Sequence, residues 1–120
     1  MGDKKIRGGA LVARALRDKG IDNVFTLSGG FCNPALEGFM ECQINVINCP
    51  HEQIAGHLAD GHTRISRKPS VCIVGPEGFA NAVPSMMEAW GERSPVIFIT
   101  GSSSLKRQGA GGFKLSLIHI

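Results

Sequence analysis

The 120-residue chain has little excess of either charge. Its 13 Lys and Arg residues against 10 Asp and Glu residues leave a formal charge of +3, and the basic residues are scattered along the chain. Nucleic-acid-binding domains gather Lys and Arg on one face, so nucleic acid is not an expected partner. We expect Arg64, Arg67 and Lys68 to form the solvated end of a helix.

Long apolar runs are also absent. No stretch approaches the roughly 20 apolar residues of a membrane-spanning helix, and the N-terminal MGDKKIRGG contains no apolar run of signal-peptide length. The sequence therefore predicts no contact with a membrane, and we expect a cytoplasmic location. A composition of 42% hydrophobic and 19% charged residues is typical of one folded domain.

The sequence also lacks the usual cysteine and histidine patterns of a metal site. Its four cysteines form no C-x-x-C pair, which in a cytoplasmic chain predicts reduced, partly buried thiols. The segment HEQIAGH places His51 and His57 six residues apart, whereas the H-E-x-x-H zinc helix needs a spacing of four. No metal site is therefore predicted on this chain.

Short apolar segments alternate with helical segments along the chain. The predicted order is helix 10–19, strand 24–27, helix from an Asn33 cap to about residue 42, strand 44–48, helix 51–66, strand 71–74, helix 81–91 and strand 96–100. Such alternation predicts an α/β fold, a doubly wound parallel sheet with helices on both faces. The strands lack polar alternation, as expected for parallel strands buried on both sides.

Two of these helices carry more detailed predictions. The helix over 10–19 is amphipathic, and its expected buried stripe consists of Leu11, Val12, Ala15 and Leu16. In the helix over 81–91, Pro84 is expected to mark the first turn, because proline disrupts a helix interior. The large apolar residues expected in the core from this helix are Met86, Met87 and Trp90.

Three loops are expected to meet at the carboxyl edge of the sheet, where open α/β sheets bind ligands: 28–31, 50–53 and 75–78. Two of them contain glycine, which permits close backbone approach to a ligand but also suits a plain turn. Glu52 begins a helix, where the helix dipole favours a carboxylate by about 0.3–1 kcal/mol. The alternative is a partly desolvated carboxyl group positioned for proton chemistry.

Four stretches of the sequence resemble one known family. They are GGALVARALRDKGIDNVFTLSGGFCNPALEGF, PHEQIAGHLADGHTRISRKPSVCIV, EGFANAV and SPVIFITGSSS. Together they are similar to the N-terminal pyrimidine-binding domain of thiamine diphosphate enzymes of the acetolactate synthase type, over nearly all of residues 8–114. The most specific part is H-E-Q at 51–53, followed by A-D-G and an arginine.

The resemblance implies a catalytic role for Glu52. The matching glutamate hydrogen-bonds the ring nitrogen N1′ of the cofactor aminopyrimidine and so assists removal of the C2 proton of the thiazolium. The substrate implied is a small-molecule 2-oxo acid, and the reaction is decarboxylation and carboligation of the acetolactate synthase type, or that of a related lyase or decarboxylase.

The resemblance also implies further site residues. The residues expected to bind the cofactor are Gly29, Gly30, Glu52, Gly78 and Asn81. Phe113 matches a phenylalanine near the substrate. The sequence departs from the family at three places: Pro50 stands where arginine commonly precedes the histidine, Glu77 intrudes into the G-P-G-x-x-N turn, and Lys114 replaces glutamine.

The resemblance further implies a larger protein. In the family a separate C-terminal domain, with a G-D-G…N signature, holds Mg²⁺ and the diphosphate, and nothing in this chain matches it. Residues 1–114 are therefore predicted to be a pyrimidine-binding domain that is incomplete at its C-terminus and inactive alone. The full-length parent is expected to be a homodimer or homotetramer.

The last six residues, LSLIHI at 115–120, allow two interpretations. They resemble a translated sequencing adapter, which makes them a non-native tail, or they form a fifth strand. Two rival functions also remain at this stage. One is a non-catalytic α/β binding or regulatory module, and the other is a flavodoxin-like nucleotide-binding domain, which the absence of G-x-G-x-x-G and G-K-[ST] disfavours.

Overall fold

The sheet has four parallel strands in the order β2-β1-β3-β4. In the computed structural model, residues 6–102, 104 and 106 are described. The elements are α1 Gly8–Asp18, β1 Asn23–Thr26, α2 Asn33–Glu41, β2 Asn45–Asn48, α3 Glu52–Ser66, β3 Ser70–Val74, α4 Gly78–Gly91 and β4 Val96–Thr100. None of the helices in this described part is long and apolar enough to cross a bilayer.

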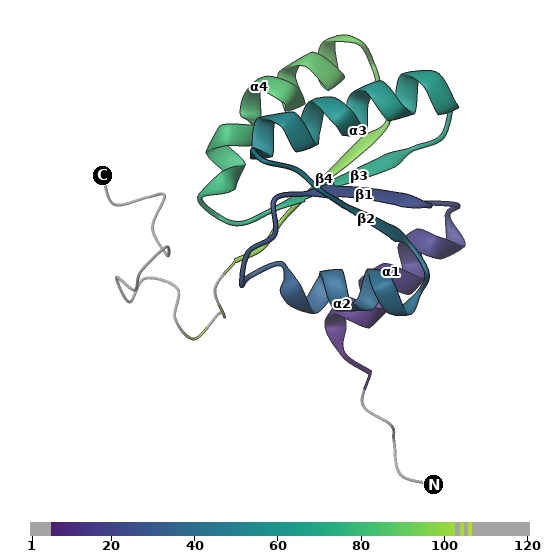
Figure 1. Cartoon of the computed structure of the whole chain (residues 1–120), viewed down its shortest axis with the longest axis vertical. Helices are drawn as coiled ribbons and strands as arrows, with labels where there is room; N and C mark the ends of the chain where they lie inside the picture. Colours follow the sequence, from purple (N-terminus) through teal and green to yellow (C-terminus); the bar gives the residue numbers. More distant parts are fainter. Residues whose placement is uncertain (1–5, 103, 105, 107–120) are drawn as a thin grey trace, which may run out of the picture.

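The helices cover both faces of the sheet (Figure 1). Helices α1 and α2 lie on one face, and α3 and α4 lie on the other. The predicted doubly wound α/β fold is therefore confirmed. The strands and helices follow the predicted order along the chain, and the helices supply the cover that the parallel strands need.

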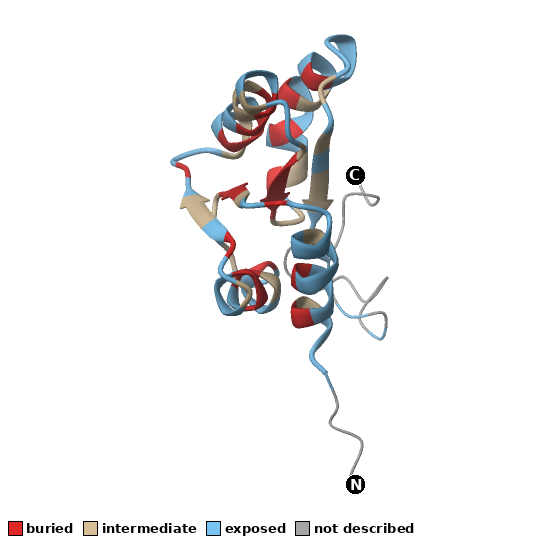
Figure 2. Ribbon diagram, turned by 90° about the vertical axis from the view of Figure 1, so that its right-hand side faces the viewer, coloured by how far each residue is buried: buried red, intermediate tan, exposed pale blue. Residues whose placement is uncertain are grey.

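The two faces of the sheet have separate apolar cores. Val24, Val71 and Ile73 point toward α1 and α2, where they pack around Phe39. Phe25, Cys72 and Val74 point toward α3 and α4. Figure 2 shows that burial concentrates in the middle of the sheet. The five residues of β3 are all buried, whereas the edge strands β2 and β4 are partly exposed, so the expectation of complete burial holds only for the central strands.

Helices α1 and α2 approach each other through glycine. A Cβ at Gly38 would lie 2.5 Å from the carbonyl oxygen of Gly9, and a Cβ at Gly9 would collide with the backbone of Pro34. The small residues Ala10 and Ala13 are accordingly the buried ones on α1. Of the predicted stripe, Leu16 packs partly buried against the core, as expected. Leu11, Val12 and Ala15 are exposed, because close backbone packing buries the alanines on the other side of the helix.

Two further predictions about helices need correction. Helix α2 begins at Asn33 with Cys32 in the capping position, so Asn33 is not the cap. Helix α4 begins at Gly78, which places Pro84 in its interior. The helix continues through the proline because Ala82 and Ser85 on either side of it are buried.

Of the three large apolar residues predicted in the core from α4, Met86 is half-buried and the other two are exposed. Trp90 is 82% exposed and Met87 is 65% exposed, so the prediction that they lie in the core was wrong. The contact between α3 and α4 is made instead by small residues, and a Cβ at Gly56 would collide with the Ser85 hydroxyl. Since small residues bring the helix axes together, the bulky ones are left on the outer face.

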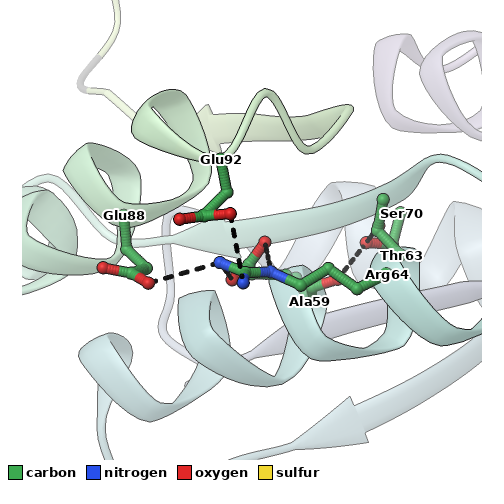
Figure 3. Close-up of polar contacts among 7 residues, drawn as sticks. Ala59, Thr63, Arg64, Ser70, Glu88 and Glu92 are labelled. Atoms are coloured by element: carbon green, nitrogen blue, oxygen red, sulfur yellow. Dashed lines mark hydrogen bonds and ion pairs between the residues drawn. The ribbon is translucent and has the colours of Figure 1, made fainter.

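An ion-pair cluster also links α3 to α4. The Arg64 guanidinium lies 2.7 Å from the buried Asp60 carboxylate, 3.3 Å from Glu88 and 3.6 Å from Glu92 (Figure 3). Burial acts to raise the pKa of Asp60, but the hydrogen bonds from Arg64 and Ser94 and the charge of Arg64 outweigh it and hold this pKa below its ordinary value of 3.8. Arg64 lies in the last turn of α3 with its side chain 40% exposed, as expected for a solvated helix end, and its ion pairs also link α3 to α4.

Replacing Gly38 by alanine should destabilise the domain. The added Cβ would meet the Gly9 carbonyl at 2.5 Å, and overpacking of this kind costs about 1–3 kcal/mol. Gly61→Ala in α3 is the matched control, because no atom lies within 4 Å of a Cβ there and alanine favours a helix. Urea unfolding of both variants checks the prediction, and equal stability of the two would contradict it.

The Asp60 carboxylate should make stability depend on acid pH. Because its folded pKa is lowered, the stability it contributes is present above the ordinary value of 3.8 and is lost as pH falls through the lower folded pKa. The Asp60→Asn variant should therefore be less stable than the original chain at pH 7, and the difference should shrink toward pH 3. Urea midpoints across this range measure it; a gap that stays constant with pH would refute the assignment.

Candidate functional site

The topology of the sheet places a ligand site at one edge. From β1 the chain passes to α2 on one face, and from the neighbouring strand β3 it passes to α4 on the other face. Open α/β sheets bind ligands at such a switch point, outside the carboxyl ends of the strands. The loops that follow β1, β2 and β3 all emerge at this edge, as the sequence predicted.

Glu52 is fixed by the start of α3. His51 has an extended backbone, and its Nδ1 accepts a hydrogen bond of 3.1 Å from the backbone N–H of Gln53, which caps the helix. Glu52 is the first helical residue, and its side chain is half-buried. The histidine therefore has a local structural role, and the carboxylate next to it is presented at the carboxyl edge of the sheet.

The start of α4 meets the Glu52 carboxylate directly. The Nδ2 of Asn81 donates a hydrogen bond of 3.1 Å to Glu52 Oε2. A Cβ at Gly78 would lie 2.6 Å from both Cγ and Oε1 of Glu52, so only glycine leaves room for the carboxylate. Three of the predicted site residues are thus brought together in one cluster, with Glu52 joining Gly78 and Asn81 from a distant part of the sequence.

Two buried thiols lie on the face of the sheet that α3 and α4 cover. Cys49 and Cys72 are buried in the core on the α3 and α4 face, and both are free thiols. Burial, with smaller contributions from Cys49, Cys32 and Glu52, raises the pKa of Cys72 to about 12. Cys72 lies near enough to Glu52 for the carboxylate charge to contribute to the raised pKa of this thiol.

Gly29 and Gly30 lie at the same edge, in the loop between β1 and α2. The loop is held by the Asn48 side chain, which accepts a hydrogen bond of 3.1 Å from the backbone N–H of Ser28. No atom lies within 4 Å of a Cβ at either glycine, and neither has a positive φ. Within the described part of the chain, packing and backbone strain therefore do not require glycine at these two positions.

Some features of this edge were not anticipated. Thr26, the last residue of β1, has a fully buried hydroxyl with no hydrogen-bond partner within the part of the chain described here. Gly101 packs tightly against Phe31, since a Cβ there would lie 2.8 Å from both the Cβ and the carbonyl oxygen of Phe31. Thr26 belongs to an apolar strand and Gly101 to a Ser-rich segment, so the sequence pattern did not single out either residue.

Two predictions concern residues that are not described. Phe113, predicted near the substrate, and the segment 115–120 both lie outside the described residues. Among the residues that are described, no group of three or more His, Cys, Asp or Glu side chains could hold a metal ion.

The chain is a doubly wound α/β domain in which Glu52, at the carboxyl edge of the sheet, is hydrogen-bonded by Asn81 and lies against Gly78. The chain belongs to the family described as "Thiamine pyrophosphate enzyme, N-terminal TPP binding domain", which matches residues 6–119. The resemblance inferred from the H-E-Q tripeptide and its surroundings is therefore confirmed.

Individual relatives are enzymes of several kinds. The chain is 36% identical over 111 residues to the acetolactate synthase large subunit of Mycobacterium tuberculosis, covering 91% of this chain and 20% of the relative. It is 35% identical to 2-hydroxyacyl-CoA lyase 2 of Danio rerio, over 89% of this chain and 17% of that protein. The chain thus spans about a fifth of the length of the curated relatives it matches.

Solved structures share the fold. The thiamine diphosphate-dependent 4-hydroxybenzoylformate decarboxylase of Rhodococcus jostii RHA1 superposes with a TM-score of 0.82 at 21% identity, over 90% of this chain and 20% of that one. Benzoylformate decarboxylase from Polynucleobacter necessarius gives a TM-score of 0.81 at 21% identity, over 94% of this chain and 21% of that one. At this level of identity, the likeness is one of fold.

Alanine at Gly78 should displace the Glu52 carboxylate. The new Cβ would overlap Cγ and Oε1, so the side chain must rotate and the hydrogen bond from Asn81 must break. The matched control is Gly75→Ala in the same turn, where the nearest atom to a Cβ lies at an ordinary 3.4 Å. The NMR signals of the Asn81 side-chain amide should move in the first variant only; an unchanged amide in Gly78→Ala would contradict the geometry.

Proposed function

We propose that the chain is the aminopyrimidine-binding part of a larger thiamine diphosphate-dependent enzyme that acts on 2-oxo acids by decarboxylation and carboligation. The observation that carries the proposal is the Glu52 carboxylate, held by Asn81 and backed by Gly78 at the ligand edge of the sheet. Membership of the thiamine pyrophosphate enzyme family supports it, as does homology to acetolactate synthases.

The residues present suit an aminopyrimidine ring. Gly78 leaves a space that a Cβ would fill, and the Glu52 carboxylate occupies this space at the start of α4. Among the described residues only Asn81 hydrogen-bonds this carboxylate, and it does so at Oε2. A carboxyl group held in this way can share a proton with a ring nitrogen through its other oxygen, which is the interaction that an aminopyrimidine requires.

The bound cofactor supplies the carbanion chemistry at its thiazolium C2 atom. In this proposal Glu52 holds a proton at the ring nitrogen N1′, and Asn81 fixes the orientation of the carboxylate so that the proton transfer is aligned. Gly78 and the backbone beside it exclude water from one side of the carboxylate. In the β1–α2 loop, Gly29 and Gly30 would border the ring, since no atom lies within 4 Å of a Cβ at either position.

Other parts of the proposed enzyme lie beyond the described residues. In this proposal Phe113 lies on the substrate side of the site, and the diphosphate and Mg²⁺ are assigned to the C-terminal domain that the family resemblance implies. We accordingly propose that the isolated chain is inactive, and that a homodimer or homotetramer in the cytoplasm completes the site. Acetolactate synthesis, or the reaction of a related lyase or decarboxylase, is the proposed activity of the parent.

A non-catalytic binding or regulatory module is the second candidate. The feature that favours it is the turn at 75–78, where Glu77 departs from the G-P-G-x-x-N pattern of the family. Such a module would retain the fold but would have no use for a half-buried glutamate oriented by Asn81. The two functions are therefore separated by the chemistry of Glu52.

Replacing Glu52 by glutamine in the full-length protein should leave folding intact and slow exchange of the cofactor C2 proton by about 10²–10⁴-fold, because glutamine retains the shape of the side chain but cannot transfer the proton. The exchange rate is measured by quenching in deuterated buffer and NMR of the released cofactor. Glu88→Gln is the matched control, since Glu88 lies on the exposed side of α4 and pairs with Arg64. Unchanged exchange in Glu52→Gln would favour the non-catalytic module.

A further inference from the structure

A row of polar side chains crosses the amino edge of the sheet. Asn45 and Asn23 are the first residues of β2 and β1, and they lie opposite each other in the strand register. The Nδ2 of Asn45 donates a hydrogen bond of 3.1 Å to Asn23 Oδ1, and Asn23 Nδ2 lies 3.2 Å from Nε2 of His62 in α3. Asn45, Asn23 and His62 thus form a relay that connects the exposed start of an edge strand to a half-buried imidazole.

The amide of Asn23 determines where the ring of His62 carries its proton. Because Asn23 Oδ1 accepts from Asn45, its Nδ2 faces the ring, and an amide nitrogen can only donate. The imidazole Nε2 must therefore accept, so the neutral ring carries its proton on Nδ1. That nitrogen lies 3.5 Å from Ser66 Oγ, which itself accepts a hydrogen bond of 3.2 Å from the backbone N–H of Lys68. The hydrogen bonds of the relay thus all run from the edge strand toward the helix.

A second proton on the imidazole would disrupt this direction. It would be added at Nε2, which would then point at the Nδ2 of Asn23, and two donors cannot hydrogen-bond to each other. The ring itself is packed against the buried Phe25, with the two ring centroids 5.7 Å apart and the ring planes at 54°. Since this packing opposes movement of the ring, the group that can respond to the new proton is the Asn23 amide.

The charged groups around the relay are themselves paired. The four described strands contain no charged residue, and their one titratable group is the Cys72 thiol. The only charged residue within α4, Glu88, pairs with Arg64. At the amino edge of the sheet, Lys68 Nζ lies 3.1 Å from Asp22 Oδ2. The other titratable side chains of α3 are Glu52, His57, Asp60 and Arg64. A proton added at Nε2 of the imidazole therefore meets the neighbouring amide of the relay.

We propose that the relay is a pH-sensitive switch, in which protonation of His62 turns over the side-chain amides of Asn23 and Asn45. Asn23 Oδ1 then accepts from the imidazolium, its Nδ2 donates to Asn45 Oδ1, and the amino group of Asn45 turns toward solvent. A hydrogen bond from a charged donor is stronger than one between neutral groups, so the reversed arrangement is stabilised while the ring is protonated. Histidine is the side chain that ordinarily changes charge between pH 5 and 8.

The switch changes the surface of an edge strand. Asn45 is exposed at the start of β2, so its outward group is the amide oxygen when the ring is neutral and the amino group when the ring is protonated. The edge of a sheet is where another chain can hydrogen-bond to it, and such a chain would meet an acceptor in one state and a donor in the other. The relay contains no residue of the carboxyl edge, so the switch is independent of the proposed function.

An NMR titration of the ¹⁵N-labelled 120-residue chain from pH 8 to pH 5 tests the switch. At pH 8 the nitrogen shifts of the His62 imidazole should show the proton on Nδ1. As the pH falls, the side-chain amide signals of Asn23 and Asn45 should shift with the same midpoint as the ring, because the three groups change together. In the His62→Gln variant both amide signals should lose this pH dependence.

His57→Gln is the matched control. It removes an exposed imidazole from the same helix and should leave both amide titrations unchanged. A His62 proton on Nε2 at pH 8 would overturn the direction of the relay and the inference with it. Amide signals that stay constant while the ring titrates would show that the asparagines only pack the strand ends, which also overturns the inference. These two results come from the unaltered chain, so they do not depend on the folding of His62→Gln.

Discussion

Close backbone approach at glycine is the constraint on which the rest of the structure depends. Gly56 admits the Ser85 hydroxyl between α3 and α4, and Gly78 admits the Glu52 carboxylate at their N-terminal ends. If these helices stood further apart, Asn81 could not reach Glu52. The contact between Asn81 and Glu52 therefore lies at the end of a packed helix pair, and its geometry depends on the small residues between the helices.

The order of strands and helices could be predicted because each strand is a short apolar run and each helix has a periodic pattern. The residues that form the buried face of each helix could not be predicted in this way. Side-chain size alone indicated Leu11, Met87 and Trp90, whereas the structure buries alanine, glycine and serine at the points of closest approach. Hydrophobic patterning identifies an amphipathic helix, but it cannot anticipate which pairs of helices will come within backbone contact.

The site was predictable in a similar, partial way. Glu52 stands after an apolar strand and at a helix start, so its place at the ligand edge followed from local signals. Its pairing with Asn81, 29 residues away, is a tertiary contact that no local pattern encodes. Only the family resemblance joined these residues before the structure did. The position of the Glu77 carboxylate, 3.4 Å from a Cβ built at Gly75, had no local signal in the sequence. A glutamate beside a helix start is ordinarily expected to interact with that helix.

The exposure of Trp90 has an optical consequence. It is the only tryptophan in the chain, there is no tyrosine, and its indole stands on the outer face of α4. Intrinsic fluorescence from this protein therefore reports the solvent around that face and is a poor reporter of the apolar core. Its emission would shift to the blue when another surface covers α4, and would change little when the domain unfolds on its own.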